Sequence, residues 1–153
     1  MIIYVAGFTA SGKSTIGKEL AQLLNIQFID LDERVEQVLG TDIASFFKEH
    51  GEAAFRKIER EVLLKLPKEI NEDSLVALGG GSMCSDSNAE FLLHTGVVLY
   101  LHRPLEYFLE NLDFLMEHRP LFQGLNPNKA RSKLINIYHH RSQYYSLSQL
   151  KTP

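Results

Sequence analysis

An eight-residue stretch near the N-terminus has the residue types and spacing of a phosphate-binding loop. The stretch Gly7–Ser14 reads GFTASGKS and matches the pattern G-x-x-x-x-G-K-[ST] at every fixed position. It follows the apolar run Ile2–Ala6 and precedes residues with helical periodicity, so it joins a strand to a helix. Its glycines let backbone N–H groups face phosphate oxygens, and the helix N-terminus adds positive potential. Lys13 would bridge the β- and γ-phosphates of a nucleotide, and the Ser14 hydroxyl would bind Mg²⁺. The nucleotide-binding residues predicted here are Gly7, Ser11, Gly12, Lys13, Ser14 and Thr15.

A second glycine-rich stretch, Gly79–Gly81, follows the apolar run Leu75–Leu78. Three successive glycines cost conformational entropy on folding and offer no side chain for packing. At the C-terminal end of a parallel strand they lie where open α/β sheets bind their ligands. We therefore interpret Gly79, Gly80 and Gly81 as backbone that a ligand approaches closely. The alternative is a loose connecting loop.

Two carboxylates, Asp30 and Asp32, stand at the end of the predicted strand Gln27–Asp30. In an extended segment their side chains point to the same side, because strand side chains alternate. One could then reach the Mg²⁺ shell and the other an acceptor hydroxyl. Alternatively, Asp32 serves only as the cap of the next helix.

Three arginines complete the set of candidate site residues. Arg56 and Glu59 are three residues apart on one predicted helix and share a face, as a surface ion pair also would. Arg119 lies in an irregular stretch, from which an arginine can close on a transferring phosphoryl group. Arg141 lies on the apolar side of the last predicted helix, where a buried charge needs a partner. A substrate carboxylate or a nearby Glu would supply that partner.

The elements that must position these residues alternate between short apolar runs and helix-period segments, a pattern typical of a parallel sheet with crossover helices. The predicted strands are Ile2–Ala6, Gln27–Asp30, Leu75–Leu78 and Val97–Leu101. The predicted helices are Ser14–Leu24, Asp32–Leu39, Asp42–His50, Glu52–Leu66 (closed by Pro67), Pro104–Met116 and Asn128–Tyr145. We expect a single domain over residues 1–153.

Composition narrows the class of protein. The 153 residues are 44% hydrophobic and 23% charged, which excludes intrinsic disorder over the whole chain. A formal net charge of −3 argues against a dedicated nucleic-acid-coating protein. The single cysteine, Cys84, cannot form an internal disulfide and favours a reducing cytosol. No apolar run approaches the roughly 18 residues that span a bilayer.

Together, these motifs resemble the shikimate kinase family over roughly residues 1–145. The residues that carry the resemblance are Gly7–Ser14, Phe28–Asp32, Phe47 with Gly51, Glu52, Phe55, Arg56 and Glu59, then Gly79–Gly81, Arg119–Leu121, Arg141 and Tyr145. The resemblance implies an α/β, three-layer P-loop kinase fold with a central parallel sheet of four to five strands flanked by helices. It also implies a mobile lid loop at about 117–128 and acceptor-binding helices at about 32–66.

The activity implied by this resemblance is transfer of the γ-phosphoryl group of ATP to the 3-hydroxyl of shikimate, with Mg²⁺, on the route to chorismate and aromatic amino acids. It implies a cytoplasmic enzyme, and we expect a monomer with no nucleic-acid or membrane partner. Lys13, Asp32 and Arg119 would be catalytic: Asp32 binds the reacting hydroxyl, and Arg119 closes over the phosphates. Arg56 and Arg141 would clamp the substrate carboxylate. The resemblance further implies that Glu59 orients Arg56 and that Gly80 offers its backbone N–H to the substrate. It also implies that Asp30 binds Mg²⁺ indirectly.

Two departures from the family pattern concern the nucleotide base. Where relatives carry an arginine that stacks on adenine, this chain has Glu110-Asn111-Leu112. After Tyr145 only eight residues follow, so we expect the fifth strand and part of the base pocket to be missing. Two other functions stay open: another small-molecule kinase of the gluconate or nucleoside monophosphate type, and a catalytically weak ligand-binding relative.

Overall fold

The computed structural model describes all 153 residues and has one parallel sheet of five strands in the order β2-β3-β1-β4-β5. The strands are β1 (Ile2–Ala6), β2 (Gln27–Asp30), β3 (Ser74–Ala77), β4 (Val97–Tyr100) and β5 (Leu150–Lys151). All four predicted strands are therefore confirmed to within one residue at each end.

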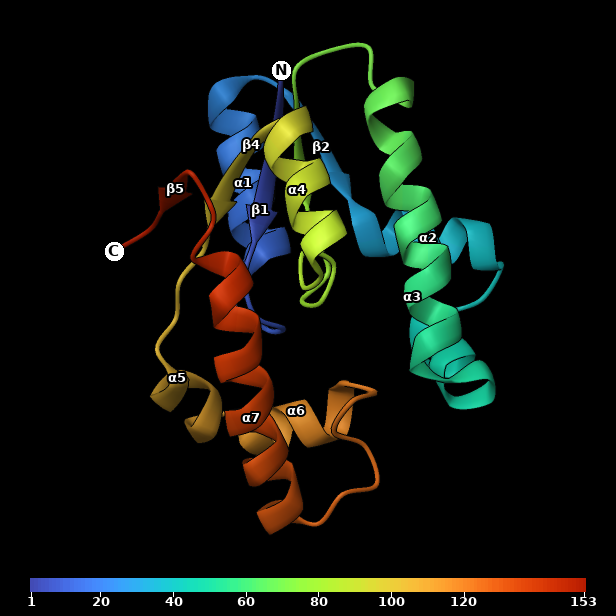
Figure 1. Ribbon diagram of the computed structural model, residues 1–153, viewed down its shortest axis with the longest axis vertical. Helices are drawn as coiled ribbons and strands as arrows, with labels where there is room; N and C mark the ends of the chain where they lie inside the picture. The colour runs from blue at the N-terminus through green and yellow to red at the C-terminus, as the bar shows by residue number, and fades with distance from the viewer.

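Seven helices flank the sheet and extend beyond its edge (Figure 1). They are α1 (Lys13–Leu24), α2 (Leu31–Leu39), α3 (Ile43–Glu69), α4 (Asp86–Thr95), α5 (Leu105–Glu110), α6 (Leu112–His118) and α7 (Pro127–Tyr145). Helix α1 covers one face of the sheet and α4 covers the other, which confirms the three-layer α/β arrangement. None of the helices is both long and apolar enough to cross a membrane.

Side chains of β1 point alternately to the two faces of the sheet and pack into the core on each side. Tyr4 and Ala6 join the larger apolar cluster, which includes Leu92 of α4. Val5 points the other way and packs with Ala21 of α1. Successive strand side chains point to opposite faces, so a strand covered on both sides is apolar at every position.

The parallel register brings the candidate residues to one edge of the sheet. Val5 pairs with Ala77, and Ala77 pairs with Asp30, so β1, β3 and β2 end at the same level. The phosphate-loop sequence after β1, Asp30 at the end of β2 and the glycines after β3 therefore meet there.

One expectation about the C-terminus is wrong, because the fifth strand is present. Leu150 and Lys151 pair with Leu99 and Tyr100 of β4. The Gln149 side chain also accepts a hydrogen bond from the Val98 N–H at 2.7 Å. A two-residue, exposed strand carries no apolar pattern, and its pairing is visible only in three dimensions.

The helices also depart from their predicted bounds. Helix α4 was not predicted from the sequence. The expected helix Pro104–Met116 is divided at Asn111, whose side chain donates to the Tyr107 carbonyl at 2.7 Å and competes with continued helix. In α3 the backbone leaves helical geometry at Gly51 (φ 82°, ψ 173°), where two separate helices are predicted. Pro67 does not close this helix, which continues to Glu69.

Candidate active site

The phosphate loop has the backbone geometry that its sequence predicts. Ala10 and Gly12 both have positive φ, 60° and 95°, and Gly12 is the N-cap of α1. Gly7 lies beneath the loop, where a Cβ atom would stand 2.7 Å from the Leu101 carbonyl oxygen. The loop therefore opens directly onto the N-terminus of α1, where N–H groups have no intrahelical partner.

Lys13 is held across this loop. Its Nζ donates to the Phe8 carbonyl at 2.8 Å, and the residue is only 8% exposed. Burial lowers the pKa of Lys13 to about 8, although the nearby Asp32 carboxylate opposes this change. A buried cation with one carbonyl partner favours an anionic ligand, since phosphate oxygens would stabilise its charged form.

Asp30 and Asp32 line the same cavity, but not because both lie in one extended segment, as the sequence predicts. Asp30 ends β2, but Asp32 lies in the first turn of α2, not in an extended segment. Asp30 is the N-cap of α2 and accepts from the Asp32 N–H at 2.9 Å, so the capping role belongs to Asp30. Its other oxygen accepts from the Ser14 hydroxyl at 2.5 Å.

Asp32 is left without a cation at hydrogen-bonding distance. Burial, together with the neighbouring carboxylates of Glu59 and Asp30, raises the pKa of Asp32 to about 6. A carboxyl group with this pKa is largely ionised near neutral pH but is a stronger base than an exposed aspartate. It suits the removal of a proton from a hydroxyl group.

Arg56 and Glu59 form the ion pair that their spacing predicts. Arg56 Nη1 donates to Glu59 Oε1 at 2.7 Å, and the Glu59 side chain is 2% exposed. The outer carboxylate of Glu52 lies 3.5 Å from Arg56 Nε. The pair is thus not a solvated surface contact, because its acidic partner is inside the protein.

Arg141 is the opposite case, a buried guanidinium without an acidic partner. The residue is 6% exposed and makes no ion pair or side-chain hydrogen bond, and its guanidinium lies 5.6 Å from the centre of the Phe8 ring. An unpaired buried charge is costly, so this position favours an anion that the protein does not itself supply.

The glycine triplet packs directly against these charged groups. A Cβ atom on Gly81 would stand 2.5 Å from Arg56 Nη2, and one on Gly80 would stand 2.8 Å from the Thr9 backbone nitrogen. The triplet is therefore not a loose loop, because any larger residue would displace Arg56 or the phosphate loop.

Two cavities meet at this edge of the sheet. The first, here called the phosphate-loop cavity, has a volume of about 400 Å³ and is lined by residues 9–15 together with Asp30 and Asp32. The second, the arginine cavity, has a volume of about 360 Å³ and is lined by Arg56, Arg141 and the glycine triplet. Five residues line both cavities: Thr9, Asp32, Gly79, Gly80 and Arg119.

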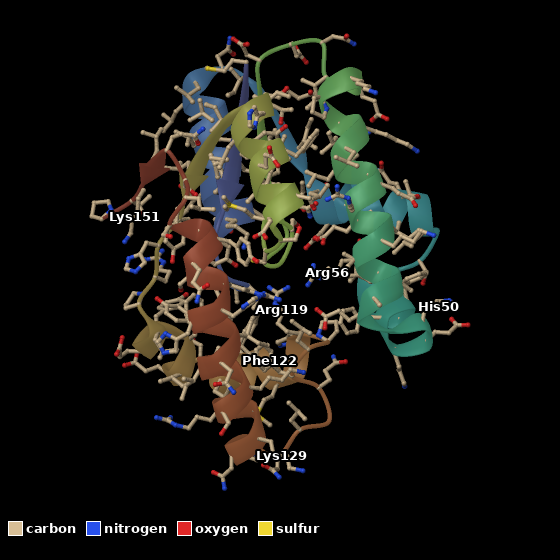
Figure 2. The ribbon with its side chains drawn as sticks, in the orientation of Figure 1. His50, Arg56, Arg119, Phe122, Lys129 and Lys151 are labelled. Carbon is tan, nitrogen blue, oxygen red and sulfur yellow. The ribbon has the colours of Figure 1, made fainter.

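Arg119 lies where the cavities join, in the extended segment after α6. Its Nε is buried without a hydrogen-bond partner, and its guanidinium packs near the Phe114 ring. In Figure 2, Arg56 and Arg119 approach the central space between α3 and α7, whereas Lys129 and Lys151 lie at the periphery. Thus all four predicted arginine and aspartate side chains around the junction, Arg56, Arg119, Arg141 and Asp32, share one cavity.

Several residues that line the phosphate-loop cavity are not predicted from the sequence. Tyr107, Asn111 and Phe114 line it opposite the loop. Their only sequence signal is a spacing of three or four residues, which would place them on one face of a helix. Asn111, a departure from the family pattern, is thus part of the lining of the phosphate-loop cavity.

The oxygen atoms beside the loop fit a hard divalent cation. Ser14 and Asp30 offer a hydroxyl and a carboxylate, both oxygen donors of the kind that Mg²⁺ prefers. No group of three or more His, Cys, Asp or Glu side chains forms a closed metal cage.

The fold and the paired cavities define a P-loop phosphotransferase, in which a phosphate loop faces a separate acceptor pocket. The family model described as shikimate kinase matches residues 9–152. The chain is 32% identical over 148 residues to the shikimate kinase of Parabacteroides distasonis, covering 97% of this chain and 84% of that protein. The chain belongs to the shikimate kinase family.

Solved structures agree with this membership. A crystal structure of shikimate kinase from Bacteroides thetaiotaomicron superimposes with a TM-score of 0.85 at 30% identity, covering 99% of this chain and 85% of that one. Shikimate kinase from Acinetobacter baumannii in complex with shikimate gives a TM-score of 0.84 at 33% identity, covering 99% and 82%. The fold class expected from the sequence is therefore confirmed.

Proposed function

We propose that this protein transfers the γ-phosphoryl group of ATP to the 3-hydroxyl of shikimate, giving shikimate 3-phosphate and ADP. The observation that carries the proposal is the junction of the two cavities at Asp32 and Arg119. A base and a cation at that junction suit an in-line transfer from a nucleotide on one side to an alcohol on the other.

In the arginine cavity, Arg56 and Arg141 bind the carboxylate of the acceptor. Arg141 supports this role because its buried charge has no protein partner. Two guanidinium groups provide the planar, forked recognition that a carboxylate favours. Glu59 holds Arg56, and the backbone of Gly79, Gly80 and Gly81 lies close enough to contact the bound acceptor.

At the junction, Asp32 hydrogen-bonds to the reacting hydroxyl and accepts its proton as the new P–O bond forms. The raised pKa of Asp32, about 6, lets it take this proton near neutral pH. ADP leaves with the electron pair of the broken P–O bond. Asp32 then returns its proton to solvent when product is released.

On the nucleotide side, Gly7, Ser11, Gly12 and Thr15 shape the loop that binds the phosphates, and Lys13 contacts their β- and γ-oxygens. Arg119 neutralises charge on the transferring group, moving with the lid at about 117–128. Ser14 would hold Mg²⁺ directly and Asp30 would do so indirectly. When bound, this ion neutralises phosphate charge and helps to orient the γ-phosphoryl group.

We further propose that the chain works as a single domain and as a monomer, because residues of one chain line both cavities. A cytoplasmic location is proposed with it, since ATP is available there and the lone thiol of Cys84 stays reduced. Neither a nucleic acid nor a membrane surface is needed for the reaction.

The direct test is ADP release measured with shikimate as the sole acceptor, beside parallel assays with gluconate and AMP. We expect turnover with shikimate alone, loss of turnover in Lys13→Met, and loss on chelation with EDTA that Mg²⁺ restores. Turnover of gluconate or AMP without turnover of shikimate would reject the proposed acceptor. Calorimetric binding of shikimate without any ADP release would reject the kinase activity itself.

A further inference from the structure

We infer that Ser82 is a positioning residue for the acceptor site: it holds the carboxylate of Glu59 so that Arg56 meets the acceptor carboxylate in a fixed orientation. This inference rests on the proposed function and deepens it. Ser82 is fully buried, directly after the glycine triplet, and it lines neither the phosphate-loop cavity nor the arginine cavity. It would act through Glu59 rather than by touching a substrate.

The two oxygens of Glu59 are occupied from opposite sides. Oε1 accepts from Arg56 Nη1 at 2.7 Å, and Oε2 accepts from the Ser82 hydroxyl at 2.6 Å. Glu59 has three side-chain torsions, so the Arg56 contact by itself leaves the carboxylate free to rotate. The second contact removes that freedom and leaves one orientation for the guanidinium.

Ser82 is itself held by a chain of contacts that returns to α3. Asn88 Nδ2 donates to the Ser82 carbonyl at 2.7 Å, and Arg60 Nη1 donates to Asn88 Oδ1. Arg60 directly follows Glu59 in α3. The contacts Glu59–Ser82–Asn88–Arg60 thus form a closed ring between α3, the glycine turn and the first turn of α4.

The ring sets the position of α3 relative to the glycine triplet. The head of Arg56 lies so close to Gly81 that a Cβ atom there would overlap it. Any rotation of Glu59 would therefore move Arg56 against this backbone or out into the cavity. Because a carboxylate is recognised by a forked pair of hydrogen bonds, a small rotation of the guanidinium weakens recognition.

The ring also keeps a buried negative charge satisfied. Glu59 is 1% exposed, and an ionised carboxylate at such a depth needs donors to remain charged. Arg56 and the Ser82 hydroxyl are the two donors it has. When the acceptor carboxylate draws on Arg56, Ser82 remains as the donor that does not have to be shared.

The test compares the variant Ser82→Ala with Ser74→Ala. Ser74 is equally buried but lies at the N-terminal end of β3, away from the site. Its hydroxyl contacts the Gln27 side chain and the Glu72 carbonyl. For Ser82→Ala we expect KM for shikimate to rise about five- to tenfold, the size expected for the loss of one ordinary hydrogen bond, with KM for ATP and kcat within about twofold. For Ser74→Ala we expect both KM values and kcat to stay unchanged, even if this variant loses as much melting temperature as Ser82→Ala.

Two further variants separate positioning from stability. Ser82→Cys keeps a weak donor on a slightly larger side chain, so we expect its KM for shikimate to lie between those of Ser82→Ala and the unaltered protein. Asn88→Ala removes the support of the Ser82 backbone and should raise the same KM by a smaller factor. A fall in melting temperature for Ser82→Ala with the shikimate KM unchanged would overturn the inference. Absence of shikimate turnover in the unaltered protein would instead reject the proposed function, so the two failures are distinguishable.

Discussion

Asp32 Oδ1 and Glu59 Oε2 each lie 2.9 Å from the point where a Cβ atom on Gly79 would stand, so two carboxylates converge on one glycine. Only one of them, Glu59, has an arginine and a hydroxyl donor. Burial raises the pKa of Asp32, and the neighbouring Glu59 carboxylate raises it further. This relationship suits Asp32 to accept a proton, whereas Glu59 is occupied in holding Arg56.

Replacing Glu59 with Gln should move the acid side of the pH profile. Burial and the Glu59 charge raise the pKa of Asp32 to about 6, so removing that charge lowers the pKa of Asp32 and leaves the base ionised at lower pH. We expect the midpoint of the acid limb of kcat/KM to fall by about half a pH unit or more. Glu52→Gln is the matched control, since Glu52 contacts the same Arg56 but is half exposed. An equal shift in both variants would contradict the assignment.

Asp32→Asn should stabilise the protein while removing its activity. The pKa of Asp32 is higher in the folded protein (about 6) than its ordinary value of 3.8, so its ionisation opposes folding as the pH rises through this interval. Above pH 6 the cost is complete, and Asn avoids it. We expect the variant to be about 1–2 kcal/mol more stable at pH 7.5 after allowance for partial exposure, and turnover to fall at least about 100-fold.

This gain should disappear near pH 4, where the carboxyl of Asp32 is protonated in the folded protein. Thermal unfolding at pH 4 and pH 7.5 measures the difference, with Asp113→Asn on the exposed side of α6 as control. A gain that is equal at both pH values would show that ionisation of Asp32 is not its cause.

Replacing Arg141 with Met should separate acceptor binding from nucleotide binding. The substitution keeps an apolar stem beside Phe8 but removes the buried charge that has no protein partner. We expect KM for shikimate to rise about 10- to 100-fold, the loss of a charge-assisted contact, while KM for ATP changes little. Arg131→Met, on an exposed turn of the same helix, should alter neither constant. An equal rise in KM for shikimate and for ATP would count against binding of the acceptor carboxylate by Arg56 and Arg141.

Nucleotide binding should take up protons above pH 8. Burial lowers the pKa of Lys13 to about 8, and bound phosphates favour its charged form, so at pH 8.5 binding of ATP recharges a partly neutral lysine. Calorimetry at pH 8.5 in buffers of different ionisation enthalpy should show uptake of up to about one proton, with little uptake from this group at pH 7. Constant ATP affinity between pH 8 and pH 10 would rule out this linkage.

Much of the candidate site was predictable from the sequence because its signals are local. The phosphate loop needs glycine at Gly12, where φ is 95°, and it needs a strand before it and a helix after it. The Arg56–Glu59 pair follows from a spacing of three residues on a helix. Parallel strands end at one edge, which brings Gly79–Gly81 to the loop.

The geometry around Asp32 was predicted for the wrong reason. Its placement beside Asp30 in an extended segment was expected, yet α2 begins at Leu31 because Asp30 caps it. A helix start shifted by one residue turns the side chain by about 100°, since a helix has 3.6 residues per turn. Local pattern therefore identified the residue, but only the packed cavity showed which groups it faces.

Other features depend on contacts between residues distant in the chain. The Ser82 hydroxyl reaches Glu59 across 23 positions, and the Tyr145 hydroxyl reaches the Gly80 carbonyl across 65. The strand β5 exists only because Leu150 and Lys151 return to β4. The sequence by itself determined the chemistry available, because residue types and short spacings are set along the chain. Tertiary structure decided which groups share a cavity and which ones satisfy each other's charges, because those distances arise only when helices pack on the sheet.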